Sequence, residues 1–152
     1  MPKRIFSDTS CLIALSNVGK LEILNNLFGE VVITGIVATE FKTKLPDWLI
    51  IKEVHNQAKQ LELEKHLDKG EASIIALALE HPGCTLVIDE FKGRKIACSL
   101  GLDIIGTIGL LILAEKSGAI NNPVEIAADL MQTGFRLSPR IFNKLKKLYN
   151  TK

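Results

Sequence analysis

Aromatic residues are scarce in this sequence, at 5% of 152 residues. A core with few aromatic rings is mainly aliphatic, and this favours helices packed on a buried sheet over an all-β sandwich. No apolar run reaches the roughly 18 residues that a helix needs to cross a bilayer. The N-terminal segment meets Asp8 before the apolar centre of a signal peptide could form. We therefore expect a cytoplasmic protein with no membrane contact.

Cysteine is also scarce, and its pattern argues against disulfides and zinc. The three cysteines are Cys11, Cys84 and Cys98, an odd number with no Cys-x-x-Cys pair, and the three histidines are scattered. Because each cysteine has apolar neighbours in the sequence, we expect three reduced, buried thiols. The glycine-rich signatures GxGxxG and GxxxxGK[ST] are absent, which argues against Rossmann-type and P-loop nucleotide binding.

Acidic residues are missing from the C-terminal part of the chain. No acid follows Asp129, while this segment holds six of the 19 basic residues: Arg136, Arg140, Lys144, Lys146, Lys147 and Lys152. The preceding residues therefore carry 13 basic against 17 acidic groups. A basic tail on an acidic body is typical of contact with a polyanion or a partner, and equally of a solvated terminal helix.

The hydrophobic pattern alternates between short strands and helices. Strands are predicted at 4–7, 31–33, 49–51, 85–88 and 103–105, and helices at 11–15, 20–28, 36–41, 57–67, 71–79, 92–100, 107–116, 123–131 and 139–149. Apolar strands separated by helices predict an α/β fold with a parallel sheet covered on both faces. We interpret residues 1–152 as a single domain with a basic C-terminal helical extension from about residue 120.

In such sheets the working site lies at the carboxyl ends of the strands, and four acids are placed to reach it. Asp8 directly follows the first strand and Asp89 the fourth, while Glu40 and Glu71 lie on helices. Each acid also has a purely structural explanation. Asp8 and Asp89 are good helix N-caps, Glu71 suits a helix dipole, and Glu40 suits a solvated helix face.

Four carboxylates at one sheet edge would repel one another unless a cation lay among them. A ligand set made only of oxygen atoms favours Mg²⁺ or Mn²⁺ over zinc. Such an ion activates water and neutralises the charge that develops during in-line phosphoryl transfer, so no nucleophilic side chain is needed. The acids therefore indicate metal-dependent phosphodiester chemistry.

The amino-acid sequence around these acids resembles that of the PIN-domain nucleases. The matching segments are Asp8-Thr9-Ser10, Ala38-Thr39-Glu40-Phe41, Gly70-Glu71-Ala72, Val87-Ile88-Asp89 and Gly106-Thr107-Ile108-Gly109. The resemblance covers roughly residues 3 to 118 and is strongest to a divergent bacterial and archaeal branch similar to VapC-type toxin nucleases. It implies a three-layer α/β/α sandwich with a mainly parallel sheet of about five strands.

The resemblance also implies an activity, that of a Mg²⁺- or Mn²⁺-dependent endoribonuclease that cuts RNA. Homodimers are usual in this family, and its toxin members are often blocked by a partner antitoxin protein. The metal-binding and catalytic acids that the resemblance implies are Asp8, Glu40, Glu71 and Asp89. Ser10 would hold the first acid or a metal-bound water. Glu90 is a supporting candidate that could substitute for Asp89 or compete with it. Thr107, at the start of a helix, either faces the same edge in support or serves only as a helix N-cap. Lys92, Arg94 and Lys95 follow Asp89 closely enough to hold a phosphate, or form a solvated basic face.

Two positions depart from the family pattern. Glu71 stands where many members have Asp, and Val87 replaces a common Thr. These departures leave a second hypothesis open, a catalytically weak or inactive PIN-like module that binds RNA or protein.

Overall fold

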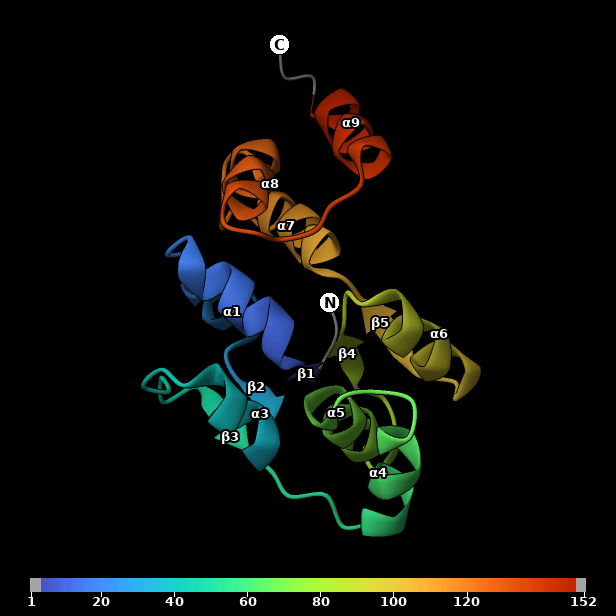
Figure 1. The fold of residues 1–152 in the computed structure, drawn as a ribbon. Coiled ribbons are helices and arrows are strands. Elements are labelled where there is room, and N and C mark those ends of the chain that lie inside the picture. Colours follow the sequence, from blue (N-terminus) through green and yellow to red (C-terminus); the bar gives the residue numbers. More distant parts are fainter. Residues whose placement is uncertain (1–3, 150–152) are drawn as a thin grey trace.

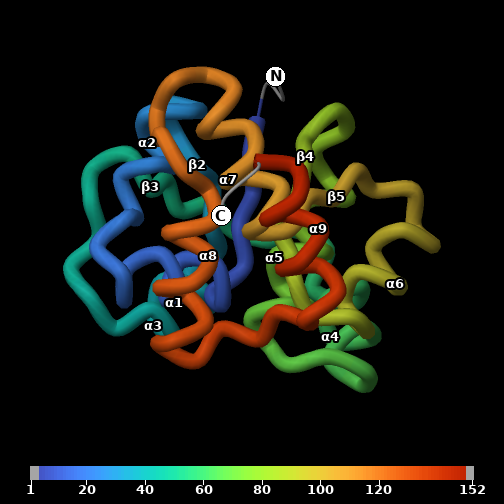
Figure 2. Tube along the Cα trace, turned by 90° about the horizontal axis from the view of Figure 1, so that it is seen from above, coloured from blue at the N-terminus to red at the C-terminus, as the bar shows by residue number. Residues whose placement is uncertain are grey.

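A computed structural model describes residues 4–149 and contains one parallel sheet. Its strands are β1 (Ile5–Ser7), β2 (Val31–Ile33), β3 (Leu49–Ile51), β4 (Thr85–Val87) and β5 (Asp103–Ile105). They lie in the order β3-β2-β1-β4-β5, and every neighbouring pair is parallel. Figure 2 shows β3 and β2 on one side of the molecule and β4 and β5 on the other. The predicted α/β class and five-stranded parallel sheet are confirmed.

Nine helices connect and follow these strands within residues 4–149. They are α1 (Thr9–Asn17), α2 (Glu22–Phe28), α3 (Gly35–Phe41), α4 (Gln57–Glu64), α5 (Lys69–Leu79), α6 (Phe91–Ser99), α7 (Thr107–Lys116), α8 (Pro123–Gln132) and α9 (Pro139–Leu148). In this part of the chain, none of the helices is long and apolar enough to span a membrane. Lys152, the last basic residue of the predicted C-terminal extension, lies outside the described residues.

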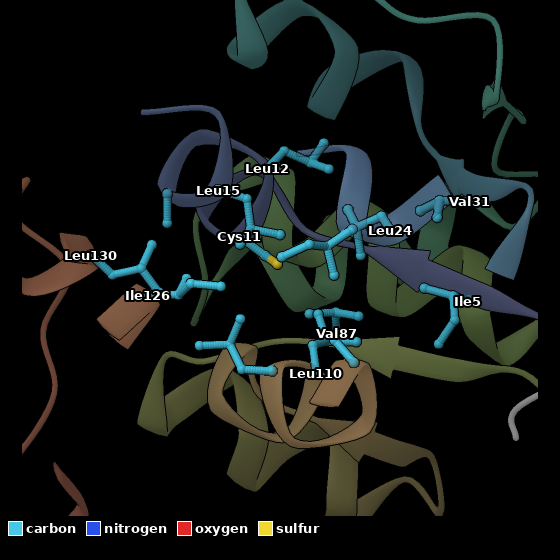
Figure 3. Close-up of a cluster of buried hydrophobic side chains, with 14 of the residues drawn as sticks. Ile5, Cys11, Leu12, Leu15, Leu24, Val31, Val87, Leu110, Ile126 and Leu130 are labelled. Atoms are coloured by element: carbon cyan, nitrogen blue, oxygen red, sulfur yellow. The ribbon is translucent and has the colours of Figure 1, made fainter. Parts of the chain in front are cut away.

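Helix layers cover both faces of the sheet, because successive strand residues point to opposite sides. Ile5 of β1 packs with α1, α2, α7 and α8, whereas the next residue, Phe6, packs with α5 and α6. Figure 1 shows α7, α8 and α9 stacked beyond α1, with α4, α5 and α6 around the β4–β5 half of the sheet. In Figure 3, Ile5 and Val87 from neighbouring strands point into the same cluster as Leu110 and Leu130. The three-layer α/β/α arrangement is therefore confirmed.

Most helices begin at a polar residue whose side chain accepts a hydrogen bond from the first turn. These N-caps are Asp8 for α1, Thr34 for α3, Asn56 for α4, Asp68 for α5, Glu90 for α6, Asn122 for α8 and Ser138 for α9. Helices α2 and α7 differ, because they start after Leu21 and Gly106, which provide no capping side chain. The first turn of α7 therefore takes its hydrogen-bond acceptor from elsewhere in the fold.

Three expectations about single positions need correction. Cys98 is exposed, whereas Cys11 and Cys84 are buried as predicted. The inner face of α6 is set by Gly93 and Ala97, four residues apart, and Cys98 lies about 100° further round the helix. The N-cap of α6 is Glu90 rather than Asp89. Helix α4 stops at Glu64 rather than residue 67, although Leu67 is still buried beneath it.

Candidate metal centre

The site lies where the strand order reverses. From β1 the chain first builds β2 and β3 on one side, and then crosses back to build β4 on the other side of β1. Ser7 pairs in register with Val87, so the residues after β1 and β4 leave the sheet side by side. The backbone N–H of Asp8 donates to the Val87 carbonyl at 3.2 Å. Ligands of open parallel sheets bind at this kind of switch point, outside the carboxyl ends of the strands.

Asp8 is the most buried acid of this edge, with 1% of its surface exposed. Its Oδ1 caps α1 by accepting the backbone N–H of Cys11 at 3.1 Å. Its Oδ2 is buried with no hydrogen-bond partner, the one side-chain N or O atom in this condition among residues 4–149. A bare, desolvated carboxylate oxygen costs free energy that a bound cation or proton would remove.

The free-energy cost of burying this carboxylate also appears in the pKa of Asp8. Burial raises its pKa from the ordinary 3.8 to about 8, against the lowering effect of the Cys11 hydrogen bond. The negative charges of Asp89, Glu71 and Asp68 contribute to this rise in the pKa. At neutral pH, without a cation nearby, Asp8 therefore holds a proton.

Asp89 is fixed by the first turn of α7. Its Oδ1 accepts the backbone N–H of Thr107 at 2.8 Å, and its Oδ2 accepts a short hydrogen bond from the Thr107 hydroxyl. The helix dipole at this end also favours a negative charge. Gly106 makes the approach possible, because a Cβ there would lie 2.9 Å from Asp89 Oδ1.

Glu71 lies in the first turn of α5 and is largely buried. Its backbone N–H donates to Asp68 Oδ1 at 2.8 Å, which starts the helix. Burial, together with the negative charges of Asp68 and Glu90, raises the pKa of Glu71 from 4.5 to about 7. The Glu71 carboxylate faces α6 across Gly93, where a Cβ would lie 3.1 Å from Oε2.

Glu40 reaches the same edge from α3. Its Oε1 accepts the hydroxyl of Thr9 at 2.6 Å, next to Asp8 in the chain. The same carboxylate oxygen occupies the space of a missing side chain at Gly70, the neighbour of Glu71, since a Cβ there would overlap it. Glu40 therefore lies between the beginnings of α1 and α5.

The four acids thus border one edge without forming a finished ligand set. Among residues 4–149, no group of three or more His, Cys, Asp or Glu side chains lies in an arrangement that could hold a metal ion. Glu40 and Asp89 are each turned to a threonine hydroxyl, on Thr9 and Thr107 respectively. The arrangement leaves one buried Asp8 oxygen unpaired, close enough to Asp89 and Glu71 for their charges to act on it.

The other predicted residues take different positions. Ser10 is exposed and lines a hollow beside Asp89 and Glu90. The Glu90 side chain is occupied as the cap of α6, accepting from Gly93 N–H at 2.9 Å. Arg94 lies half-buried and donates to the Ile88 carbonyl at 2.8 Å, whereas Lys92 and Lys95 are exposed on α6.

Three further residues at this edge of the sheet were not predicted as site residues from the sequence. Asp68 contributes negative charge to Asp8 and Glu71, and its spacing from Glu71 is that of a capping box, which was visible in the sequence. Thr9 holds Glu40 across 31 positions, and Arg136 lies near Asp89 from a distant loop. Neither of these two contacts leaves a local sequence signal.

Comparison with known proteins adds one finding. Residues 4–151 match a family model described as PIN domain (DUF3368). A search of curated proteins finds no match. The match covers nearly the whole chain, including all four acids and the C-terminal helices.

Proposed function

We propose that this chain, which belongs to the PIN-domain family, is a metal-dependent endoribonuclease that hydrolyses RNA phosphodiester bonds with an activated water. PIN domains are nuclease-type domains, so the family supports the reaction class. The observation that carries the proposal within this chain is the buried, unpaired Oδ2 of Asp8, at the switch point of the sheet. Asp89 and Glu71 lie close enough to raise its pKa.

The chemistry of the donors fits Mg²⁺ or Mn²⁺, which prefer carboxylate oxygens and bind through few protein ligands. We propose Asp8, Glu40, Glu71 and Asp89 as the acids that hold the ion. A bound ion of this kind supplies positive charge for the phosphoryl transition state and acidifies water. It would also offset the mutual repulsion of the acids.

The residues around the acids have positioning roles in this proposal. Thr107 orients Asp89 through two hydrogen bonds, and Thr9 orients Glu40 through one. Burial keeps water away from Asp8, so its negative charge is strongly felt by a cation. We propose that Ser10, which is exposed beside Asp89, contacts the substrate or an ordered water.

Metal binding is tested by thermal unfolding of chelator-treated protein with and without Mn²⁺. An ion present at 100 times its Kd stabilises the fold by about 2.7 kcal/mol, which raises the Tm of a chain of this size by about 5–10 °C. Asp8→Asn should remove most of this shift. Asp103→Asn, an exposed acid at the start of β5, is the matched control and should keep it. An unchanged wild-type melting curve would remove the metal site.

Cleavage is tested with mixed-sequence, single-stranded RNA and Mg²⁺ or Mn²⁺. The wild-type protein should degrade the RNA, and Asp89→Asn and Asp8→Asn should lose this activity. Equal degradation by the wild type and both variants would identify a contaminating nuclease.

A second candidate function is a PIN-like module that binds RNA or protein without cutting it. It is favoured by the observation that no three acids in residues 4–149 are already arranged around a metal position. RNA binding without cleavage in either metal would select this alternative.

We also propose that the protein is a cytoplasmic homodimer and the toxin of a toxin–antitoxin pair, which extends the resemblance to VapC-type nucleases. Expression in a bacterial host should then arrest growth, and Asp8→Asn should relieve the arrest. Growth unaffected by the wild-type protein would argue against the toxin role.

A further inference from the structure

Two hollows meet at Asp89 and share a wall from the C-terminal part of the chain. The first, of about 470 Å³, lies between α6, the start of α7 and the connection from α8 to α9. The second, of about 420 Å³, lies between α1 and the same connection. Both are lined by Asp89, Phe135 and Arg136. Figure 1 shows this connection running from the end of α8 past α7 to α9.

Arg136 is exposed where the two hollows meet. Within residues 4–149 the structure records an ion pair for Lys59 with Glu62, but none for Arg136. Its guanidinium is therefore available to a ligand, beside one of the acids proposed to hold the metal. An arginine in this position matches the geometry of a phosphate diester, which it can contact through two N–H groups.

The first hollow is also lined by a second arginine, Arg94, and by the first turn of α7. Arg94 is held by its hydrogen bond to the Ile88 carbonyl, and its guanidinium lies next to Gly106, where a Cβ would be 3.0 Å from Nη1. The first turn of α7 lines the same wall through Gly106, Ile108 and Gly109. Two guanidinium groups, those of Arg94 and Arg136, therefore lie next to an electronegative edge, as a phosphate backbone crossing a metal site would require.

The rest of the first hollow is apolar. Its lining includes Ile104, Ile105, Phe135, Leu137 and Ile141. An aromatic ring with aliphatic neighbours is a surface on which an unpaired base can stack, and recognition of this kind applies to single strands, whose bases are free of a helix. Lys92 and Lys95, by contrast, line neither hollow.

From these observations we propose that the two hollows bind single-stranded RNA across Asp89, with Arg136 contacting a phosphate next to the cleaved bond and the first hollow holding the adjoining nucleotide. This inference rests on the proposed nuclease function and extends it. It assigns a substrate-binding role to the α8–α9 connection, which follows the segment that carries the four acids.

The test measures binding separately from cleavage. A labelled single-stranded oligoribonucleotide is titrated with the full chain in chelator, and fluorescence anisotropy gives Kd at several salt concentrations. Arg136→Ala should weaken binding by about three- to tenfold and reduce the slope of log K against log salt by about 0.7, the value for one phosphate contact on a single strand. Arg136→Lys should keep the slope.

Arg140→Ala is the matched control, because Arg140 is also exposed and basic but lines neither hollow. It should change Kd by less than twofold. Equal losses for Arg136→Ala and Arg140→Ala would overturn the inference, since they would show only general attraction to a basic surface. Melting curves of both variants check that the fold is intact.

Parallel cleavage assays separate this inference from the proposed function. Cleavage by the wild type and its loss in Asp89→Asn support the nuclease even where Arg136→Ala binds RNA normally, and that binding result overturns the inference alone. A wild-type protein that neither binds nor cleaves the oligoribonucleotide overturns both.

Discussion

Thr107 and Asp89, 18 positions apart, are joined by two hydrogen bonds, one from the Thr107 backbone N–H at 2.8 Å and one from its hydroxyl. Helix α7 has no capping side chain of its own, because Gly106 stands at its N-cap. The acid at the end of β4 therefore satisfies the first turn of a helix that follows a different strand. The same contact stabilises α7 and orients a proposed metal ligand.

Thr107→Val tests this orientation. The substitution keeps the backbone N–H but removes the hydroxyl, so Asp89 loses one of its two hydrogen bonds. Loss of such a positioning contact typically weakens metal affinity by about 10- to 100-fold. Mn²⁺ titration followed by thermal unfolding should show this loss, and Thr107→Ser, which keeps a hydroxyl, should restore most of the affinity. Equal affinities for the Val and Ser variants would contradict the assigned role.

Gly70→Ala tests how closely Glu40 is held. A Cβ at Gly70 would overlap the Glu40 carboxylate, which must then leave the Thr9 hydroxyl. Because the obstructed atoms end a side chain that can turn away, we expect a stability cost of about 1 kcal/mol or less. Mn²⁺ affinity and RNA cleavage should fall in this variant, and we expect a loss of the same size in Glu40→Gln, which removes the carboxylate charge directly.

Gly35→Ala supplies the matched control for this experiment. Gly35 also begins a helix, but its added Cβ would meet Glu53 at an ordinary contact distance of 3.4 Å. Metal affinity should remain unchanged in this variant. If Gly70→Ala behaves like Gly35→Ala, Glu40 does not depend on the space at Gly70.

The raised pKa of Asp8 predicts how stability depends on pH in the absence of metal. The folded protein keeps the Asp8 proton up to about pH 8, whereas the unfolded chain loses it near the ordinary value of 3.8. Between these values the folded state binds more protons, so the free energy of unfolding falls as pH rises. Glu71, with a pKa of about 7, acts in the same direction.

Asp8→Asn should therefore flatten the decline of Tm between about pH 4 and pH 8 in chelator. At pH 8 the variant should melt higher than the wild type, by about 2–4 °C for each kcal/mol relieved. Asp103→Asn, which changes an exposed acid, should follow the wild-type curve. Parallel curves for wild type and Asp8→Asn would show that Asp8 does not titrate as its burial implies.

Cysteine accessibility tests the orientation of α6. Cys98 is exposed, whereas Cys11 and Cys84 are buried and burial raises the pKa of both thiols. In the native protein one thiol should react rapidly with a chromogenic disulfide reagent, and denaturant should release the other two. Cys98→Ser should abolish the rapid phase. A rapid phase that persists in Cys98→Ser would place another thiol at the surface.

Much of the fold was predictable because its signals are local. β-branched runs such as Val31–Ile33 and the short apolar run 103–105 identify strands directly, and Asp, Asn, Ser and Thr mark where most helices begin. Glycine stops and the helical spacing of leucines defined the helices to within a few residues. The exposed face of Cys98 was mispredicted, since apolar neighbours in sequence do not define a helix face.

The candidate site also combines local features, which the sequence predicts, with long-range contacts, which it does not. The sequence by itself determined that acids follow two strands and that two more lie on helices, because the end of a strand and the extent of a helix are local features. Only the tertiary structure decided that β1 and β4 are neighbours, that Oδ2 of Asp8 has no partner, and that Thr9, Thr107 and Arg136 reach the acids. These contacts depend on the strand order and on helix packing, which bring together residues as far apart in the chain as Ser7 and Val87, and no local propensity encodes such distances.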